Sequence, residues 1–288
     1  LIGVGLRVFE LPSWEAEQFQ INGEYIMATH DAYTWLAGAE DINRYTDRAL
    51  SKILGFLDYI THWKVANIGF WLPALFSPLV VLPIVFLAYR MKQVEAGIAA
   101  SILGASSLGF LLRTRLGFLD TDILTLFFPA AIAAGLLALL QPMCKLGLWQ
   151  SDRQEDNDNK DDGNILLLLA GGFGVGLVTA GYDWFYGKLH IALALGAMAV
   201  VLGLLLAKSN YRRTILSCLG VFFAVGFGGW IGFLLGVLII AFLAWKPQTI
   251  QDWRLVGVVL LLVLGTISNE LFNLTSGIFE KVIDYAKL

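Results

Sequence analysis

Long uncharged apolar runs dominate this 288-residue chain and restrict what it can fold into. Hydrophobic residues make up 57% of the sequence and charged residues only 15%, against about a quarter in a typical globular domain. A helix that crosses the hydrocarbon core of a bilayer needs about 20 apolar residues. The sequence therefore predicts an all-α, polytopic integral membrane bundle with membrane lipid around it. A formal net charge of -3 argues against nucleic acid as a partner.

Windows without Asp, Glu, Lys or Arg mark the expected spans. The window Thr214–Trp245 has 32 residues and would extend about 48 Å as one helix, far more than a hydrocarbon core of about 30 Å. We therefore expect two helices there, separated within Phe227–Trp230, where adjacent glycines weaken the helix. With a partial first span over Leu1–Phe9, about nine spans are expected. The other windows are Ala66–Tyr89, Ala96–Leu112, Ile123–Cys144, Asn164–Tyr182, Leu189–Ala207 and Leu255–Asn269.

Lysine and arginine collect on one side of these spans. Ten of them lie in loops 90–95, 145–163, 208–213 and 246–254, whereas loops 113–122 and 183–188 hold only three. Cytoplasmic loops are enriched in Lys and Arg, so we assign the first set to the cytoplasm. Segment 10–65, loops 113–122 and 183–188, and tail 270–288 then share the external face. In a bacterium this predicts an inner-membrane protein whose external loops face the periplasm.

The first external loop contains an amphipathic pattern. Between Glu40 and Trp63, apolar residues recur at roughly helical spacing, with charged residues between them. This pattern predicts an interfacial helix that lies on the membrane surface. A helix packed on the other spans would show the same pattern, so both interpretations stay open.

Two external stretches carry acidic residues close to apolar runs. Asp31 follows the first span, and Asp120 and Asp122 directly precede the run that begins at Ile123. Carboxylates near the hydrocarbon boundary are costly unless they are paired or bind a cation. Three carboxylates would suit Mg²⁺ or Mn²⁺, which often bridges a phosphate-bearing substrate. The alternative is that Asp120 or Asp122 simply caps the following helix.

These stretches resemble the catalytic subunit of asparagine-linked oligosaccharyltransferase, in its single-subunit bacterial form. The resemblance rests on HDAYTWLAGAED at 30–41, RTRLGFLDTD at 113–122 and the aromatic run Tyr182–Tyr186. It implies transfer of a glycan from a polyprenyl-pyrophosphate lipid to the side-chain amide of Asn in an Asn-x-Ser/Thr acceptor. The enzyme would be a glycosyltransferase, with the lipid-linked oligosaccharide and the acceptor polypeptide as its partners.

The resemblance also implies roles for single residues. Asp31 would bind a divalent cation, Mn²⁺ or Mg²⁺, and contact the acceptor amide. Asp120 would be a second metal ligand, with Asp122 as its partner in or beside the metal site. Arg113 would help to hold the acceptor site.

The aromatic run is assigned by the same resemblance. Tyr186 would face the donor sugar, and Trp184 belongs to the same substrate-binding run. The family usually continues with Pro where this chain has Gly187.

The resemblance covers only part of that family. It implies that residues 1–288 are a fragment of a multi-span transmembrane catalytic domain that lacks the C-terminal periplasmic domain. That domain carries the family's WWDYG signature, which contacts the acceptor Ser or Thr. A further acidic ligand from a later external loop is not assigned either. By this comparison, the polypeptide alone is expected to be inactive.

Three other functions fit parts of the pattern. Another membrane glycosyltransferase that uses lipid-linked sugars could share the acid in the first loop, although the spacing of Arg113, Asp120 and Asp122 favours oligosaccharyl transfer. A transporter would place charges at the midplane of broken helices, whereas the complete spans here have uncharged interiors. A purely structural subunit would leave the clustered external acids unexplained.

Overall fold

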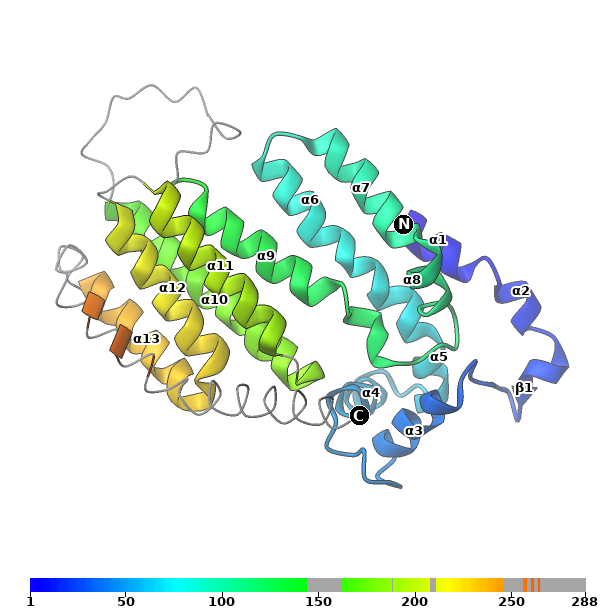
Figure 1. Ribbon diagram of the computed structural model, residues 1–288. Helices are drawn as coiled ribbons and strands as arrows, with labels where there is room; N and C mark the ends of the chain where they lie inside the picture. The colour runs from blue at the N-terminus through cyan, green and yellow to red at the C-terminus, as the bar shows by residue number, and fades with distance from the viewer. Residues whose placement is uncertain are drawn as a thin grey trace, which may run out of the picture. The chain divides into compact units, whose positions relative to one another are not determined.

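The computed structural model describes residues 1–143, 162–187, 189–207 and 211–245, with five more residues between 256 and 264. These residues are mostly helical with almost no strand, which confirms the predicted all-α membrane bundle (Figure 1). They form two compact units. One consists of Leu1–Ala131 with Trp184–Tyr186, and the other of Ile132–Asp183 with the described residues from Gly187 onward.

The first unit holds short helices and one small hairpin at its N-terminal side and longer helices after them. Its elements are α1 (Ile2–Val8), α2 (Leu11–Trp14), η1 (Glu17–Phe19), β1 (Gln20–Ile21), β2 (Glu24–Tyr25), α3 (His30–Ala39), α4 (Ala49–Thr61), α5 (Val65–Phe76), η2 (Ser77–Val80), α6 (Val81–Arg90), α7 (Val94–Ser106), α8 (Leu108–Leu112), η3 (Thr121–Leu124) and the start of α9 (Phe127–Leu140). The strands pair antiparallel, and α6 packs beside α7 (Figure 1). The second unit contains the rest of α9, most of α10 (Asp162–Tyr186), α11 (Leu189–Leu206), α12 (Arg212–Phe227) and α13 (Gly229–Trp245).

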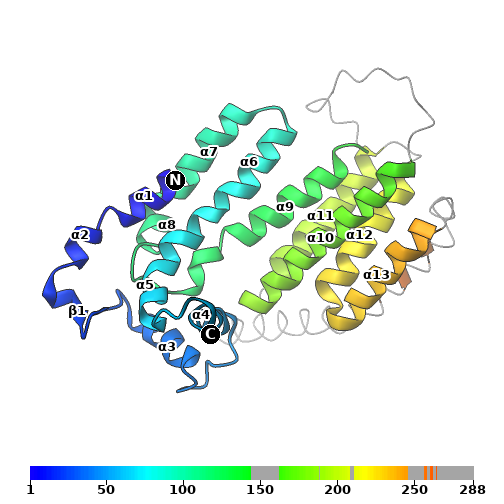
Figure 2. The same ribbon diagram turned by 180° about the vertical axis from the view of Figure 1, so that it is seen from behind.

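Four helical segments in the described part of the chain are long and apolar enough to cross a membrane. They are Val65–Arg90, Thr121–Leu140, Ile165–Tyr186 and Leu189–Leu206, and two shorter apolar helices cover Val94–Ser106 and Gly229–Leu243. The predicted division of the longest apolar run is confirmed, because α12 ends at Phe227 and α13 begins at Gly229 (Figure 2). The span expected at Leu255–Asn269 lies outside the described residues, apart from the five mentioned above.

One of the expected spans is interrupted. The span expected over Ala96–Leu112 is two helices, because Ser107 adopts an extended backbone with ψ 131° and separates α7 from α8. The Ser107 hydroxyl donates to the Gly104 carbonyl, an alternative to continued helical bonding. The span expected over Ala66–Tyr89 corresponds to the continuous helical segment Val65–Arg90, in which the short 3-10 stretch η2 links α5 to α6. Pro78 lies in this turn and cannot donate a backbone hydrogen bond.

The helix predicted between Glu40 and Trp63 begins later than expected, at Ala49. The Asn43 side chain causes the delay, because its Oδ1 accepts the Tyr45 N–H at 2.8 Å and its Nδ2 donates to the Thr34 carbonyl at 2.9 Å. Such a turn replaces helical hydrogen bonding. On one face of α4, Leu50 and Leu54 are buried in the core shared with α3 and α5.

The opposite face of α4 is exposed and apolar. It carries Phe56, Tyr59 and Ile60, and Trp63 follows the helix. The expectation of a helix packed on its neighbours therefore holds for the buried face. The position of the exposed face at a membrane surface stays a prediction.

A hydrophobic core of the first unit lies beneath the two acidic stretches. It is built from α3, α4, α5 and the segment that precedes α9, and includes Leu36, Phe70, Leu116, Leu119 and Ile123. Burial of such side chains, at about 1.5–3 kcal/mol for each one, is the main contribution to the stability of the segments packed in this core. The same core therefore supports Asp31 on α3 and the loop that carries Asp120 and Asp122.

In the second unit, α10 and α12 approach closely through a glycine. A Cβ atom added at Gly172 would lie 2.5 Å from the backbone carbonyl oxygen of Cys218 on α12. A contact that short forces the backbones apart. Gly174, two residues later on the same helix, has no neighbouring atom within 4 Å of an added Cβ.

We expect Gly172→Ala to destabilise the protein by about 1–3 kcal/mol, because the added methyl group overpacks the contact between the helices. Gly174→Ala is the matched control and should be neutral or slightly stabilising, since alanine favours a helix. Thermal unfolding of both variants in the same detergent measures the difference. Equal midpoints for the two variants would contradict the close approach of α10 and α12.

Candidate active site

Asp31 lies in the first turn of α3, where local sequence favours a negative charge. The Thr29 hydroxyl caps the helix by accepting the Ala32 N–H. Free N–H groups and the helix dipole at this end stabilise a carboxylate. The Asp31 side chain is exposed, and its Oδ1 lies 3.2 Å from His30 Nε2.

Gly117 joins the segment before α3 to the second acidic stretch. Its carbonyl accepts the Ala28 N–H at 2.9 Å, and its own N–H donates to the Phe70 carbonyl at 3.0 Å. Gly117 has φ +70°, and a Cβ atom there would lie 3.3 Å from both the Ala28 nitrogen and the Phe70 ring. Only glycine fits this left-handed, crowded position without strain. The backbone thus brings the segment that leads to Asp31 against loop 113–122.

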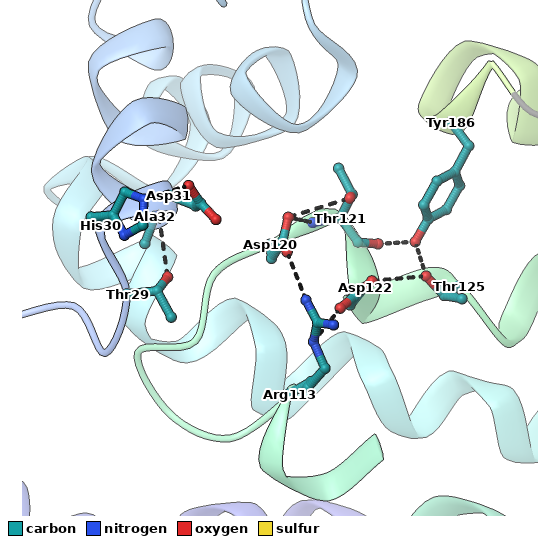
Figure 3. A network of polar contacts seen from close by, with 10 residues as sticks. All are labelled: Thr29, His30, Asp31, Ala32, Arg113, Asp120, Thr121, Asp122, Thr125 and Tyr186. Atoms are coloured by element: carbon teal, nitrogen blue, oxygen red, sulfur yellow. Dashed lines mark hydrogen bonds and ion pairs between the residues drawn. The ribbon is translucent and has the colours of Figure 1, made fainter. Parts of the chain in front are cut away.

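Arg113 binds both acids of the second stretch (Figure 3). Its Nε lies 2.6 Å from Asp122 Oδ2, and its Nη2 lies 3.6 Å from Asp120 Oδ2. The carboxylates are mostly buried, with 19% of the Asp120 side chain and 28% of the Asp122 side chain exposed. A guanidinium group that bridges two such carboxylates reduces the repulsion between them.

Asp120 also caps the turn η3. Its Oδ1 accepts the backbone N–H of Thr121 at 2.6 Å. The capping role that the sequence left open is therefore present, but it uses one carboxylate oxygen. The other oxygen, Oδ2, is directed toward Arg113 beyond ordinary hydrogen-bond distance.

Tyr186, at the end of α10, binds the same turn. Its hydroxyl donates to the Thr121 carbonyl and lies 2.6 Å from Thr125 Oγ1 (Figure 3). Thr125 Oγ1 is also 3.4 Å from Asp122 Oδ1. The Tyr186 ring packs against Phe128 and Phe185. Tyr186 thus braces the turn that presents Asp122.

The other members of the predicted site lie around this cluster. Trp184 has an exposed indole ring in the same compact unit. In Figure 3 the Asp31 carboxylate points from α3 toward Asp120. The structure therefore joins Arg113, Asp120, Asp122 and Tyr186 by direct contacts or through a threonine. In the described part of the chain Asp31 contacts none of them, and its segment is linked to theirs by the bond between Ala28 and Gly117.

The acids supply the kind of donor that a divalent cation requires. Carboxylate oxygens are preferred by Mg²⁺ and Mn²⁺, and Asp120 Oδ2 lies 3.6 Å from Arg113 Nη2, beyond ordinary hydrogen-bond distance. Within the described residues, however, no three His, Cys, Asp or Glu side chains are gathered into a metal-binding group. The acids have the donor chemistry for a cation but are not arranged as one site, and Arg113 provides the positive charge beside Asp120 and Asp122.

Sequence reasoning missed three contributors to this region. Arg7 is buried and binds Thr114, the residue after Arg113, and Thr125 links Asp122 to Tyr186. A signal for Arg7 was present, because it is the single charge within the apolar run Leu1–Phe9. The threonines carried no comparable signal.

The family of the chain follows from comparison with known proteins. Residues 49–288 match the family described as oligosaccharyl transferase STT3, N-terminal. The chain belongs to the oligosaccharyl transferase STT3 family. This confirms the resemblance inferred from the acidic and aromatic motifs.

Curated relatives of this STT3 family chain come from two strains of Campylobacter jejuni. Each is named undecaprenyl-diphosphooligosaccharide–protein glycotransferase and is 28% identical to the chain over 131 residues. The similarity covers 41% of this chain and 18% of the relative's length. The chain thus shares a limited part of the relatives' length.

The STT3 family match contains Arg113, Asp120, Asp122 and Tyr186, whereas Asp31 precedes the matched residues. The assignment of Asp31 to the same site therefore stays a prediction. The hydrogen bond from Ala28 to Gly117 links its segment to loop 113–122.

We expect Tyr186→Phe to loosen η3, because it removes both hydrogen bonds of the hydroxyl and keeps the ring. Loss of about 1 kcal/mol would speed hydrogen exchange of residues 121–125 by about fivefold. Trp184→Phe is the control, since its exposed side chain makes neither bond. Unchanged exchange in Tyr186→Phe would show that the tyrosine hydroxyl does not brace the turn.

Proposed function

We propose that this chain is the membrane-embedded part of an oligosaccharyltransferase that moves a glycan from a polyprenyl-pyrophosphate lipid to Asn in Asn-x-Ser/Thr acceptors. Family membership supports glycan transfer as the reaction class. The observation that carries the assignment to residues is the junction at Gly117, which brings the Asp31 segment to the loop of Arg113, Asp120 and Asp122. We further propose that the site faces the periplasm of a bacterial inner membrane.

The reaction makes one bond and breaks another. The acceptor amide nitrogen forms a C–N bond with the anomeric carbon of the donor, while the C–O bond to pyrophosphate breaks and the oxygen keeps the electron pair. One proton leaves the amide nitrogen. An amide nitrogen is a weak nucleophile, because resonance delocalises its lone pair into the carbonyl group.

Asp31 is the residue that would act on this amide. Its carboxylate is exposed and turned toward the Asp120 loop, so it can accept an N–H bond from a bound asparagine (Figure 3). A carboxylate that accepts such bonds orients the amide and favours negative charge on the amide nitrogen. Arg113 then has a positioning role, because it holds Asp120 and Asp122 beside the acceptor.

A divalent cation, Mn²⁺ or Mg²⁺, would be held by Asp31 and Asp120, with Asp122 in or beside the site. Bound there, it would supply positive charge next to the departing pyrophosphate. The proposal rests on the donor chemistry of the three carboxylates, which fits a hard cation.

The aromatic side chains would contact substrate on the other side of η3. The exposed Trp184 ring offers a flat apolar surface to a sugar or peptide. The ring of Tyr186 would face the donor while its hydroxyl holds Thr121.

We expect Asp31→Asn to reduce glycan transfer about 100-fold or more, because the variant keeps the shape of the side chain and removes its charge. The assay uses the full-length protein in membranes, a lipid-linked donor and an Asn-x-Thr peptide. Asp47→Asn is the matched control, since Asp47 is an exposed external acid paired only with Lys52. Transfer by Asp31→Asn near the wild-type rate, with Mn²⁺ present, would remove Asp31 from the site.

Chelation provides a separate test of the cation. We expect EDTA to stop transfer and added Mn²⁺ or Mg²⁺ to restore it, because three neighbouring carboxylates repel one another without enough positive charge. Asp120→Asn should raise the Mn²⁺ concentration needed for half-maximal rate. Turnover that continues in EDTA would exclude the proposed cation role of Asp120.

A further inference from the structure

Arg7 is an unusual buried charge. It is the only charged side chain among the buried polar residues of the described chain, with 0% of its surface exposed. It lies on α1, in an otherwise apolar run. A charged residue inside an apolar segment is costly and points to a specific task.

The hydrogen-bond partners of the Arg7 guanidinium are neutral groups. Nε and Nη2 donate to Thr114 Oγ1 at 2.9 and 2.7 Å, and Nη1 donates to the carbonyls of Gly3 and Ala105 at 2.8 and 3.0 Å. The guanidinium carbon lies 5.1 Å from the centre of the Phe110 ring. None of the ion pairs in the described residues involves Arg7.

Thr114 is the residue through which Arg7 reaches the site. Its hydroxyl donates to the Phe110 carbonyl at 2.6 Å and accepts both bonds from Arg7. Thr114 is buried, whereas 60% of the side chain of the preceding residue, Arg113, is exposed. The backbone position of Arg113 sets where its side chain starts, and the 2.6 Å contact of its Nε, close to the backbone end of the guanidinium, with Asp122 depends on that position.

The helix before Arg113 has little other anchorage. Helix α8 is five residues long and none of them is buried. It is separated from α7 by the extended Ser107. A short exposed helix has low stability by itself. The bonds from Arg7 to Thr114 and Ala105 therefore hold the end of α8 to the end of α7.

We propose that Arg7 is a positioning residue for glycan transfer. It fixes Thr114 at the start of loop 113–122 and so holds Arg113 where it binds Asp120 and Asp122. This inference rests on the proposed function for its catalytic consequence. Its structural part, the order that Arg7 imposes on loop 113–122, stands independently.

The kinetic test combines Arg7→Met with Thr114→Val in a double-mutant cycle. Each change should lower kcat about 100-fold, the scale of a catalytic group misplaced by about 1 Å. Because both substitutions remove the same contact, the kcat of the double variant should be no lower than that of the less active single variant. Arg7→Lys keeps a hydrogen-bond donor and should retain more activity than Arg7→Met. Thr114→Ser keeps the hydroxyl and should retain more activity than Thr114→Val.

A packing change in the second compact unit is the control for general loss of stability. Gly172→Ala overpacks the contact between α10 and α12, and Gly172 is none of the groups that bond to Arg7. It should lower the melting temperature without the loss of kcat. The positioning role would be overturned if the two single-variant losses of kcat multiplied in the double variant. It would also be overturned if the kcat of Arg7→Met were within about twofold of wild type.

Hydrogen exchange distinguishes this inference from the proposed function. In Arg7→Met, amides 113–122 should exchange faster while those of α12 keep their wild-type rates, and Gly172→Ala should leave loop 113–122 unchanged. Absence of transfer by the wild-type protein would refute the proposed function, and the exchange result would still decide whether Arg7 orders the loop. Unchanged exchange of the loop in both Arg7→Met and Arg7→Lys would overturn the inference.

Discussion

The backbone contact at Gly117 is the constraint on which the candidate site depends. Asp31 and Asp120 are far apart in the sequence, and their segments are joined because Gly117 bonds to Ala28 on one side and to Phe70 on the other. Backbone groups left unpaired in a buried setting are costly, so these bonds oppose any slip of the loop. Leu116 and Leu119 flank this crossing and are fully buried in the core, which adds packing to the same restraint.

The fold was predictable where hydrophobic length decides it. Helix α11 follows its apolar window closely, and the division near Phe227 follows from a run too long for one span. The interruption at Ser107 was not predicted, because hydropathy does not register a backbone turn formed within an apolar run. The late start of α4 has a similar cause, since the side-chain bonds of Asn43 outweigh the helical spacing around it.

The members of the site could be predicted in part, and their contacts could not. Residue type, motif and the expected side of the membrane selected Asp31, Arg113 and Asp120. The pairing of Arg113 with both acids and the bond from Tyr186 to η3 depend on how distant segments pack. Arg7 shows the same limit, because its charge was visible in the sequence while its partner Thr114 was set only by the fold.

The charges of the site couple the binding of its two proposed ligands, the divalent cation and the lipid-linked donor. Arg113 supplies one positive charge against the two acids it binds, and Asp31 adds a third negative charge on the neighbouring segment. Helix N-termini at Asp31 and at η3 offset only part of this excess. The remaining negative charge attracts a cation and repels the pyrophosphate of a lipid-linked donor. Under the proposed function, a cation must therefore enter before the donor or with it. Each ligand should then raise the affinity of the site for the other.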